Sequence, residues 1–197
     1  MKRTGDQAFI KDLNQSIVLN LLRFQGAISR ADISRQTGLN KATVSSIIDE
    51  LISEDYVHEI GHGQSQIGRR PMLLDFNPNV GRVIGLDLGT DYIRVLVLDL
   101  CANVLDTFEE LLSQPTDADQ TMTKMTTMLK TVVASIEPTR LGVLGIGVGV
   151  PGLVDAARGM VLNAPNLHWQ NVQLKSLLET SYLMSSTLLS SKNHEGK

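Results

Sequence analysis

The chain has 197 residues, of which 42% are hydrophobic, enough for one large domain or two modest ones. Its formal net charge of -3 and pI near 5.8 exclude a globally basic nucleic-acid binder, so any DNA contact must come from a few locally placed cations. The single cysteine, Cys101, excludes a disulfide framework or a cysteine zinc site within the chain. No apolar run matches a signal peptide or the ~20 residues of a membrane span, so we expect a cytoplasmic protein.

The first 55 residues have helical periodicity. In the first segment, apolar residues recur every four positions with others beside them, which predicts a buried helical stripe that ends at Gly26. The stripe comprises Leu13, Ile17, Leu21, Val18, Leu22 and Phe24.

Two shorter helices follow with a tight turn between them. Ser29 with Asp32 three residues later resembles a capping box, and Gly38 is a typical residue at a helix C-terminus. After the turn, Asn40 is a good N-cap for the next helix. Two helices separated by the short Gly-Leu-Asn turn predict a helix-turn-helix.

The second of these helices has an apolar side and a small polar side. Val44, Ile47, Ile48 and Leu51 follow the spacing of a buried helix face. The side chains left near the exposed N-terminal end are small or polar, which lets a helix enter the major groove of DNA. They are Lys41, Ala42, Thr43, Ser45 and Ser46. The alternative is an ordinary solvated helix face, which the preceding capped helix and the following hairpin disfavour.

A hairpin with a long tip comes next, in the position of the wing of a winged helix. Arg69 and Arg70 at the tip "GHGQSQIGRRP" are placed to contact the DNA backbone or the minor groove, with His62 and Gln64 assisting. Arg30, at the start of the second helix, is also predicted to contact DNA. The alternative is a solvated loop whose arginines pair with nearby carboxylates. The DNA-binding domain is predicted to cover residues 1–78.

The region 81–178 has a different pattern, with three apolar strands, a helix over 119–136 and a glycine-studded strand after Pro138. This order of elements fits the first half of an actin-like ATPase lobe. The composition changes at Thr180, so residues 179–197 are interpreted as an aberrant tail, and we hypothesise a frameshift there.

Several short motifs in this region have two interpretations. The turn from Asp87 to Thr90 is either a phosphate-binding turn or, as we favour, a plain hairpin turn. "GVGVPG" has the residue pattern of a dinucleotide-binding fingerprint, but such a fingerprint needs a helix after the turn and here a strand pattern follows. Its glycines are therefore interpreted as marking close packing or a ligand. His168 and Trp169 either line a sugar pocket or pack in a loop. No catalytic triad or metal-ligand cluster is indicated, and no cofactor or metal is expected.

These segments together resemble the ROK family of bacterial repressors and sugar kinases. The resemblance is carried by "TGLNKATVSSIIDEL", the wing "GHGQSQIGRRP", "IGLDLGTDYIRVLVLDL" and "GIGVGVPGLVD...NAPNLHW", and within the family it is greatest to the xylose repressors of Firmicutes. It implies a transcription factor that binds double-stranded operator DNA as a homodimer and releases it when a sugar inducer, xylose, binds. The inducer loops would include Pro151, Gly152 and Asn166.

The chain departs from the family pattern in ways that bear on function. The kinases have a phosphate turn with two adjacent glycines, whereas this chain has only Gly89. The acidic motif that supplies the sugar site and the kinase base is absent, as are the cysteine-rich zinc motif and the second lobe. We therefore expect an α/β protein with an N-terminal winged helix-turn-helix and an incomplete actin-like (ROK) lobe, and a repressor without enzyme activity. The alternatives are a sugar kinase and a DNA-binding fragment that does not respond to sugar.

Overall fold

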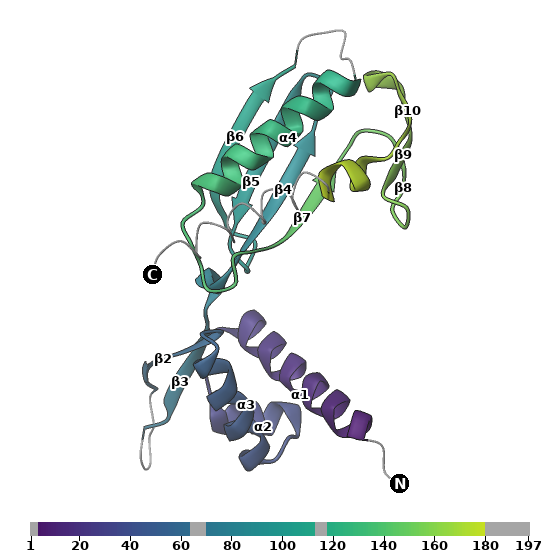
Figure 1. Ribbon diagram of the computed structural model, residues 1–197. Helices are drawn as coiled ribbons and strands as arrows, with labels where there is room; N and C mark the ends of the chain where they lie inside the picture. Colours follow the sequence, from purple (N-terminus) through teal and green to yellow (C-terminus); the bar gives the residue numbers. More distant parts are fainter. Residues whose placement is uncertain (1–3, 64–69, 113–117, 180–197) are drawn as a thin grey trace, which may run out of the picture. The chain divides into compact units, whose positions relative to one another are not determined.

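The computed structural model describes residues 4–63, 70–112 and 118–179 (Figure 1). The chain divides into two compact units, Met1–Val80 and Gly81–Lys197. Among the described residues, no helix has both the length and the apolar character needed to cross a membrane.

The first unit is a winged helix-turn-helix, as predicted. Its helices are α1 (Thr4–Gln25), α2 (Arg30–Thr37) and α3 (Lys41–Ser53). Its strands are β1 (Ile28–Ser29), β2 (Val57–His62) and β3 (Met72–Phe76), in the antiparallel order β1-β3-β2. β1 was not predicted, because a two-residue strand is too short to show alternation.

Local capping fixes the ends of α2. The Ser29 hydroxyl accepts a hydrogen bond from the Asp32 backbone N–H at 3.2 Å and donates one to the Asp32 carboxylate at 2.7 Å. Gly38 ends the helix in the left-handed conformation at φ 73°, which glycine adopts without steric cost. Ile33 of α2 packs in the core of the unit, whose fully buried members also include Val18, Leu22, Val44, Ile48, Leu51 and Leu74.

The prediction for α1 was partly wrong. Val18 and Leu22 are buried, but Leu13, Ile17 and Phe24 are 49%, 42% and 78% exposed. Apolar spacing alone cannot tell which of two neighbouring helix faces meets the core, and here the core takes the Val18–Leu22 side.

The second unit contains a four-stranded sheet in the order β6-β5-β4-β7. Its elements run β4 (Arg82–Leu88), β5 (Tyr92–Leu98), β6 (Val104–Leu111), α4 (Ala118–Ser135) and β7 (Val143–Gly149). This is the predicted order. β4, β5 and β6 are antiparallel neighbours, whereas β7 follows α4 and pairs with β4 in parallel, with Ile84 opposite Ile146.

A second, three-stranded sheet follows in the order β10-β9-β8. It is formed by β8 (Leu153–Asp155), β9 (Met160–Ala164) and β10 (Trp169–Val172), and residues 174–179 are helical. Two short 3-10 helices, η1 (Pro78–Val80) and η2 (Pro165–Leu167), occur at connections. A strand pattern was predicted where β8 lies, and β10 was not predicted.

The core of the second unit lies on the side of the large sheet that α4 covers (Figure 1). Ile84, Leu86 and Leu88 alternate along β4 and point to this side, because successive side chains of a strand face opposite ways. Met122, Met125, Leu129 and Val132 of α4 belong to the same buried cluster.

Candidate functional site

The strongest candidate site is the N-terminal end of α3. The Asn40 side chain accepts a hydrogen bond from the Thr43 backbone N–H at 2.8 Å, which fixes where the helix begins. Val44, Ile47, Ile48 and Leu51 are buried, as predicted, so the opposite side of the helix must face solvent.

The small polar side of α3 is accessible at this end. Lys41, Ala42 and Ser46 are exposed, and Thr43 and Ser45 are half-buried. Lys41 forms no ion pair with any residue that the structure describes, so its ammonium group is available to an anionic ligand. The arrangement presents one cation and several short hydrogen-bonding side chains at a helix N-terminus, which also favours phosphate by its dipole.

The hairpin β2–β3 has the geometry of a wing. The Gly63 N–H donates to the Pro71 carbonyl at 2.8 Å, which continues the pairing beyond His62 and Met72. His62 and Arg70 are exposed at this end of the hairpin. Gln64 and Arg69 lie outside the described residues.

Arg30 has several partners within its own unit. Its guanidinium group lies 2.8 Å from the Asp49 carboxylate, 3.8 Å from that of Glu59, and 3.3 Å from the Ser45 carbonyl oxygen. These contacts tie the start of α2 to α3 and β2, so a phosphate would have to compete with two carboxylates for this side chain. Arg30 therefore has a structural role here that the sequence did not reveal, and its contact with DNA stays a prediction.

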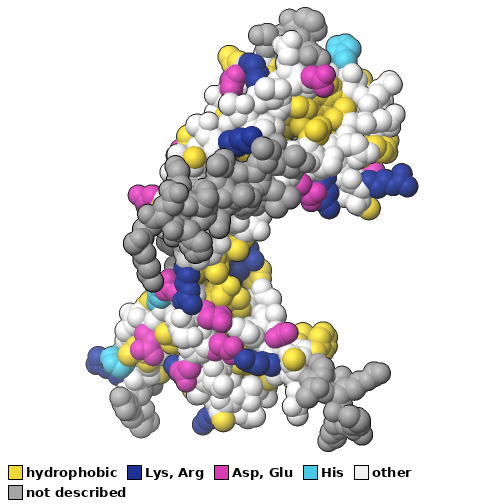
Figure 2. All heavy atoms as spheres, viewed as in Figure 1, with side chains coloured by type: hydrophobic (Ala, Val, Ile, Leu, Met, Phe, Trp, Pro, Cys, Tyr) yellow, Lys and Arg dark blue, Asp and Glu magenta, His cyan; other side chains and the backbone are white. Residues whose placement is uncertain are grey.

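The surface of the first unit carries charges of both signs. Figure 2 shows acidic side chains beside basic ones on the face turned to the viewer. This agrees with the balanced composition of the chain, and it means that only local groups such as Lys41 and Arg70 can attract a phosphate backbone.

In the second unit, the turn after β4 is a closed hairpin turn. The Gly89 N–H donates to the Tyr92 carbonyl at 2.9 Å, and a Cβ at position 89 would collide with the Tyr92 ring, so this ring lies directly over the turn. The plain-turn interpretation of Asp87–Thr90 fits this geometry, because the backbone hydrogen bond closes the turn of the β4–β5 hairpin.

The acidic residue of this turn is also engaged. The Tyr92 hydroxyl donates to Asp87 Oδ2 at 2.9 Å, and this hydrogen bond, with a smaller desolvation effect, raises the pKa of Tyr92. Arg94 lies 3.9 Å from the same oxygen and 2.7 Å from Glu109. We did not foresee this cluster from the sequence. The sequence contains a signal for this cluster, because strand alternation and a tight turn together place Asp87 opposite Arg94.

The glycines of β7 do not share one role. A Cβ at Gly145 would meet open space and one at Gly147 nearly so, which argues against close packing at these two positions. At Gly152 a Cβ would lie 2.5 Å from the Asn163 carbonyl oxygen, so only glycine fits. A strand, β8, follows this segment, as expected for a segment that is not a dinucleotide fingerprint.

The predicted inducer residues come from two neighbouring segments. Pro151 and Gly152 form the bend between β7 and β8, and Gly152 packs against Ala164 at the end of β9. Asn166 is exposed in η2, two residues further on. His168 is exposed, whereas Trp169 is only 1% exposed and belongs to the core. Trp169 is therefore packed and not available to stack on a sugar, but it is the first residue of strand β10 and does not lie in a loop.

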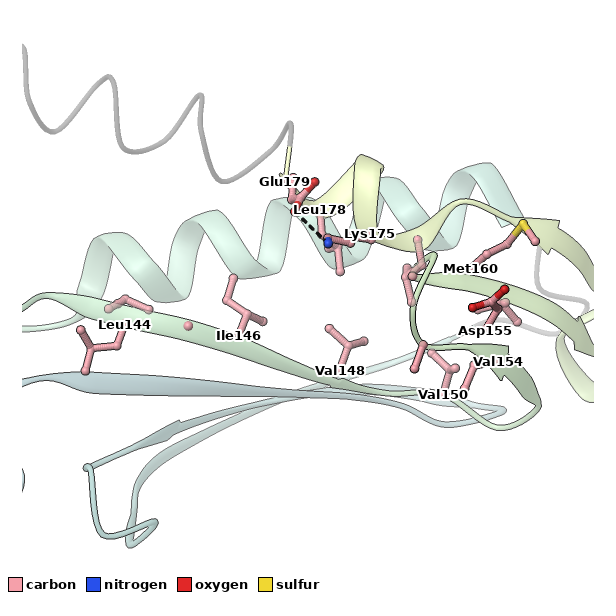
Figure 3. A pocket seen from close by; sticks show the side chains of 16 residues that line it. Leu144, Ile146, Val148, Val150, Val154, Asp155, Met160, Lys175, Leu178 and Glu179 are labelled. Atoms are coloured by element: carbon pink, nitrogen blue, oxygen red, sulfur yellow. Dashed lines mark ion pairs between the residues drawn. The ribbon is translucent and has the colours of Figure 1, made fainter. Parts of the chain in front are cut away.

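A pocket of about 760 Å³ opens beside β7 (Figure 3). Its wall is mainly apolar, and Leu144, Ile146 and Val148 point into it from β7. The Lys175–Glu179 ion pair, 3.8 Å long, lies at its border. None of the three predicted inducer residues lines it, although Val150, next to Pro151, does.

A protein-family model matches part of each of the two units. A winged helix-turn-helix DNA-binding model matches residues 12–58, and the ROK family model matches residues 83–189, more than half of the chain. The chain belongs to the ROK family. The ROK match continues past Thr180 into residues that the structure does not describe, so the aberrant-tail interpretation stays a prediction.

Several curated relatives that the chain matches are named as repressors. The chain is 41% identical over 180 residues to the xylose repressor of Caldicellulosiruptor bescii and 39% identical over 179 residues to that of Bacillus subtilis. It is 28% identical over 179 residues to the N-acetylglucosamine repressor of Escherichia coli O6:H1. Each match covers 90% of this chain but 45%, 46% and 44% of the relative, so the chain spans about half the length of these proteins.

A solved structure also resembles the fold of this chain. The crystal structure of a ROK family transcriptional regulator, a homologue of the E. coli MLC protein, matches with a TM-score of 0.65 and 26% identity. The match covers 87% of this chain and 43% of that one.

Proposed function

We propose that this chain is a non-enzymatic transcriptional repressor of sugar-utilisation genes that binds double-stranded operator DNA. The observation that carries the proposal is the N-terminal end of α3, where Lys41, Ala42 and Ser46 are exposed while the other side of the helix is fully packed. A helix presented in this way by a helix-turn-helix reads base edges in the major groove with its first residues. Thr43 and Ser45 supply further short hydroxyls, and the wing with Arg70 positions the unit on the backbone.

The inducer we propose is xylose. The support is the higher identity to two xylose repressors, 41% and 39%, than to an N-acetylglucosamine repressor, 28%. Pro151, Gly152 and Asn166 are the residues we assign to the inducer loops. The protein acts as a homodimer, because two copies of a helix-turn-helix can read two half-sites one helical turn or a multiple apart. Its location is the cytoplasm, with the genes that it controls.

The kinase alternative is disfavoured by the turn after β4. Asp87 is engaged by Tyr92 and Arg94, and the Tyr92 ring covers Gly89. Incubation of the protein with ATP and xylose or glucose tests this alternative. Sugar phosphate above background would establish the kinase activity that we argue against.

The test of the proposal is a gel shift with DNA from upstream of neighbouring xylose-catabolism genes, with and without xylose. We expect a specific complex at concentrations well below the ~10⁻⁶ to 10⁻⁴ M typical of non-specific binding, and its release by xylose but not by N-acetylglucosamine. Equal affinity for unrelated DNA would contradict the proposal. A specific complex that xylose leaves unchanged would support the alternative of a DNA-binding fragment without sugar response.

The wing arginines have their own prediction. Replacing Arg69 and Arg70 with alanine should weaken operator binding and flatten the dependence of log K on log salt, by roughly one unit of slope for each phosphate that the wing no longer neutralises. Lys130→Ala is the control; it removes one exposed positive charge from α4 in the other unit, whereas the wing variant removes two. A salt series of gel shifts measures the slopes. If the wing variant and the control give the same slope as the unaltered protein, the wing does not contact DNA.

A further inference from the structure

Arg30 joins three elements of the first unit. It is the first residue of α2, and its Nη1 atom lies 2.8 Å from Asp49 Oδ1 of α3. The same nitrogen donates to the Ser45 carbonyl of α3 at 3.3 Å, and Nη2 lies 3.8 Å from Glu59 Oε1 of β2. A guanidinium group is planar and rigid and has several donors, so one side chain can hold two elements in a fixed geometry.

The α3 partners of Arg30 lie on the side of the helix that leads to its reading end. Ser45 and Asp49 are four residues apart, about one turn, so they are neighbours on one side of α3. Lys41 comes four residues before Ser45, so this side continues to the N-terminal end of the helix. A contact that fixes Ser45 and Asp49 therefore also fixes how α3 is rotated about its own axis.

The β2 partner of Arg30 lies on the strand that leads into the wing. Glu59 is opposite Leu74 in the β2–β3 hairpin and three residues before His62, the last residue of β2. In a winged helix the reading helix enters the groove while the wing meets the backbone. Both contacts can form together only when α3 and β2 have the correct relative placement, and Arg30 forms an ion pair with each of them.

The surroundings of Arg30 are acidic. Asp49, Asp55 and Glu59 line an open hollow together with it, and Asp55 pairs with His58 at 2.8 Å. Three carboxylates around one arginine disfavour the approach of a phosphate chain. The side chains of Asp49 and Glu59 are 68% and 47% exposed, and ion pairs so exposed stabilise a fold little. A role in holding the DNA-binding geometry accounts for the arrangement better than phosphate binding or stability does.

We infer that Arg30 is a positioning residue for DNA recognition, which holds the reading end of α3 and the wing in the relative placement that DNA requires. Asp49 and Glu59 are its partners in this role, although both are negatively charged groups in a DNA-binding unit. The inference rests on the proposed binding of operator DNA. It has the consequence that removal of an acidic group weakens binding to a polyanion, whereas charge alone predicts the opposite.

Asp49→Asn tests this consequence. We expect it to lower the affinity for operator DNA about 10-fold, because asparagine cannot form the ion pair with Arg30 that holds α3. Asp12→Asn is the matched control, since it removes the same charge from an exposed position on α1, and it should leave the affinity unchanged or slightly higher. Fluorescence anisotropy of labelled DNA measures the affinities, and far-UV circular dichroism checks that each variant is folded. An affinity of Asp49→Asn equal to or above that of the control overturns the inference.

The salt dependence distinguishes positioning from a direct phosphate contact. Arg30→Gln should also lower the affinity about 10-fold, and the double variant with Asp49→Asn should be no weaker than either single variant, because the same contact is broken once. The slope of log K against log salt should stay unchanged. A slope that falls by about one unit, or losses that add in the double variant, would show an independent phosphate contact and contradict the inference.

Arg30→Lys is a second variant that keeps the charge and removes the planar fork. Positioning predicts a loss of affinity with this variant, whereas a phosphate contact predicts that lysine is tolerated. If the unaltered chain does not distinguish operator from unrelated DNA, the proposed function fails and the inference fails with it. If the unaltered chain binds operator DNA and these variants bind it equally well, the inference alone fails.

Discussion

Ser46→Glu should reduce the affinity for operator DNA by about 100-fold, or ~2.8 kcal/mol, without unfolding the protein. Ser46 is exposed near the N-terminal end of α3, and a glutamate there would face the phosphate backbone and base edges with a negative charge. The fold should tolerate the change because the buried side of the helix, which includes Ile47 and Ile48, is untouched. Fluorescence anisotropy of labelled operator DNA measures the affinity, and far-UV circular dichroism checks the fold.

Ser53→Glu is the matched control for this experiment. It introduces the same residue at an exposed position at the other end of α3, so it changes the net charge equally. We expect it to leave the affinity within about threefold of the unaltered value, since it lies away from the reading end of the helix. Equal losses from both variants would mean that total charge, and not the N-terminal end of α3, governs binding.

Trp169→Ala should be the most destabilising single change in the second unit, lowering its free energy of unfolding by about 3–5 kcal/mol. Trp169 is 1% exposed and packs in the cluster that contains Leu167 and Val161, so its removal leaves a large cavity. Urea denaturation followed by circular dichroism measures the effect.

Trp169→Phe separates the effect of ring packing from that of the indole nitrogen. Phenylalanine keeps an aromatic ring and removes the indole Nε1, which is buried and has no hydrogen-bond partner among the described residues. We expect this variant to lose far less stability than Trp169→Ala, because an unpaired buried donor costs about 1–3 kcal/mol in itself. Equal losses from both variants would show that the indole nitrogen has a necessary partner.

The helix-turn-helix could be predicted in detail because its signals are local. Ser29, Gly38 and Asn40 act within three or four residues of themselves, and each has the predicted role at a helix end. The buried side of α3 followed from spacing in the same way. The order of elements from β4 to β7 was also predictable, because apolar strand segments and the long helix α4 have different periods.

What could not be predicted depends on pairs of residues far apart in the chain. Arg30 was interpreted as a DNA contact, but whether it meets Asp49 and Glu59 is decided only when α3 and β2 come together. The exposure of Leu13 and Ile17 depends on which side of α1 the rest of the unit selects. The sequence therefore defined the elements and their capping, but not which of two apolar faces would be buried or which cations would be left free.

The two units have separate hydrophobic cores, and the only tryptophan of the chain is in the second. Intrinsic fluorescence excited at the indole band therefore reports on the second unit alone and is silent on the DNA-reading unit. The proposed binding of xylose to the second unit can be tested with this signal in the presence of DNA, with no label attached. Conversely, a melting curve recorded by tryptophan emission would miss the unfolding of the helix-turn-helix, and a second probe is needed to observe it.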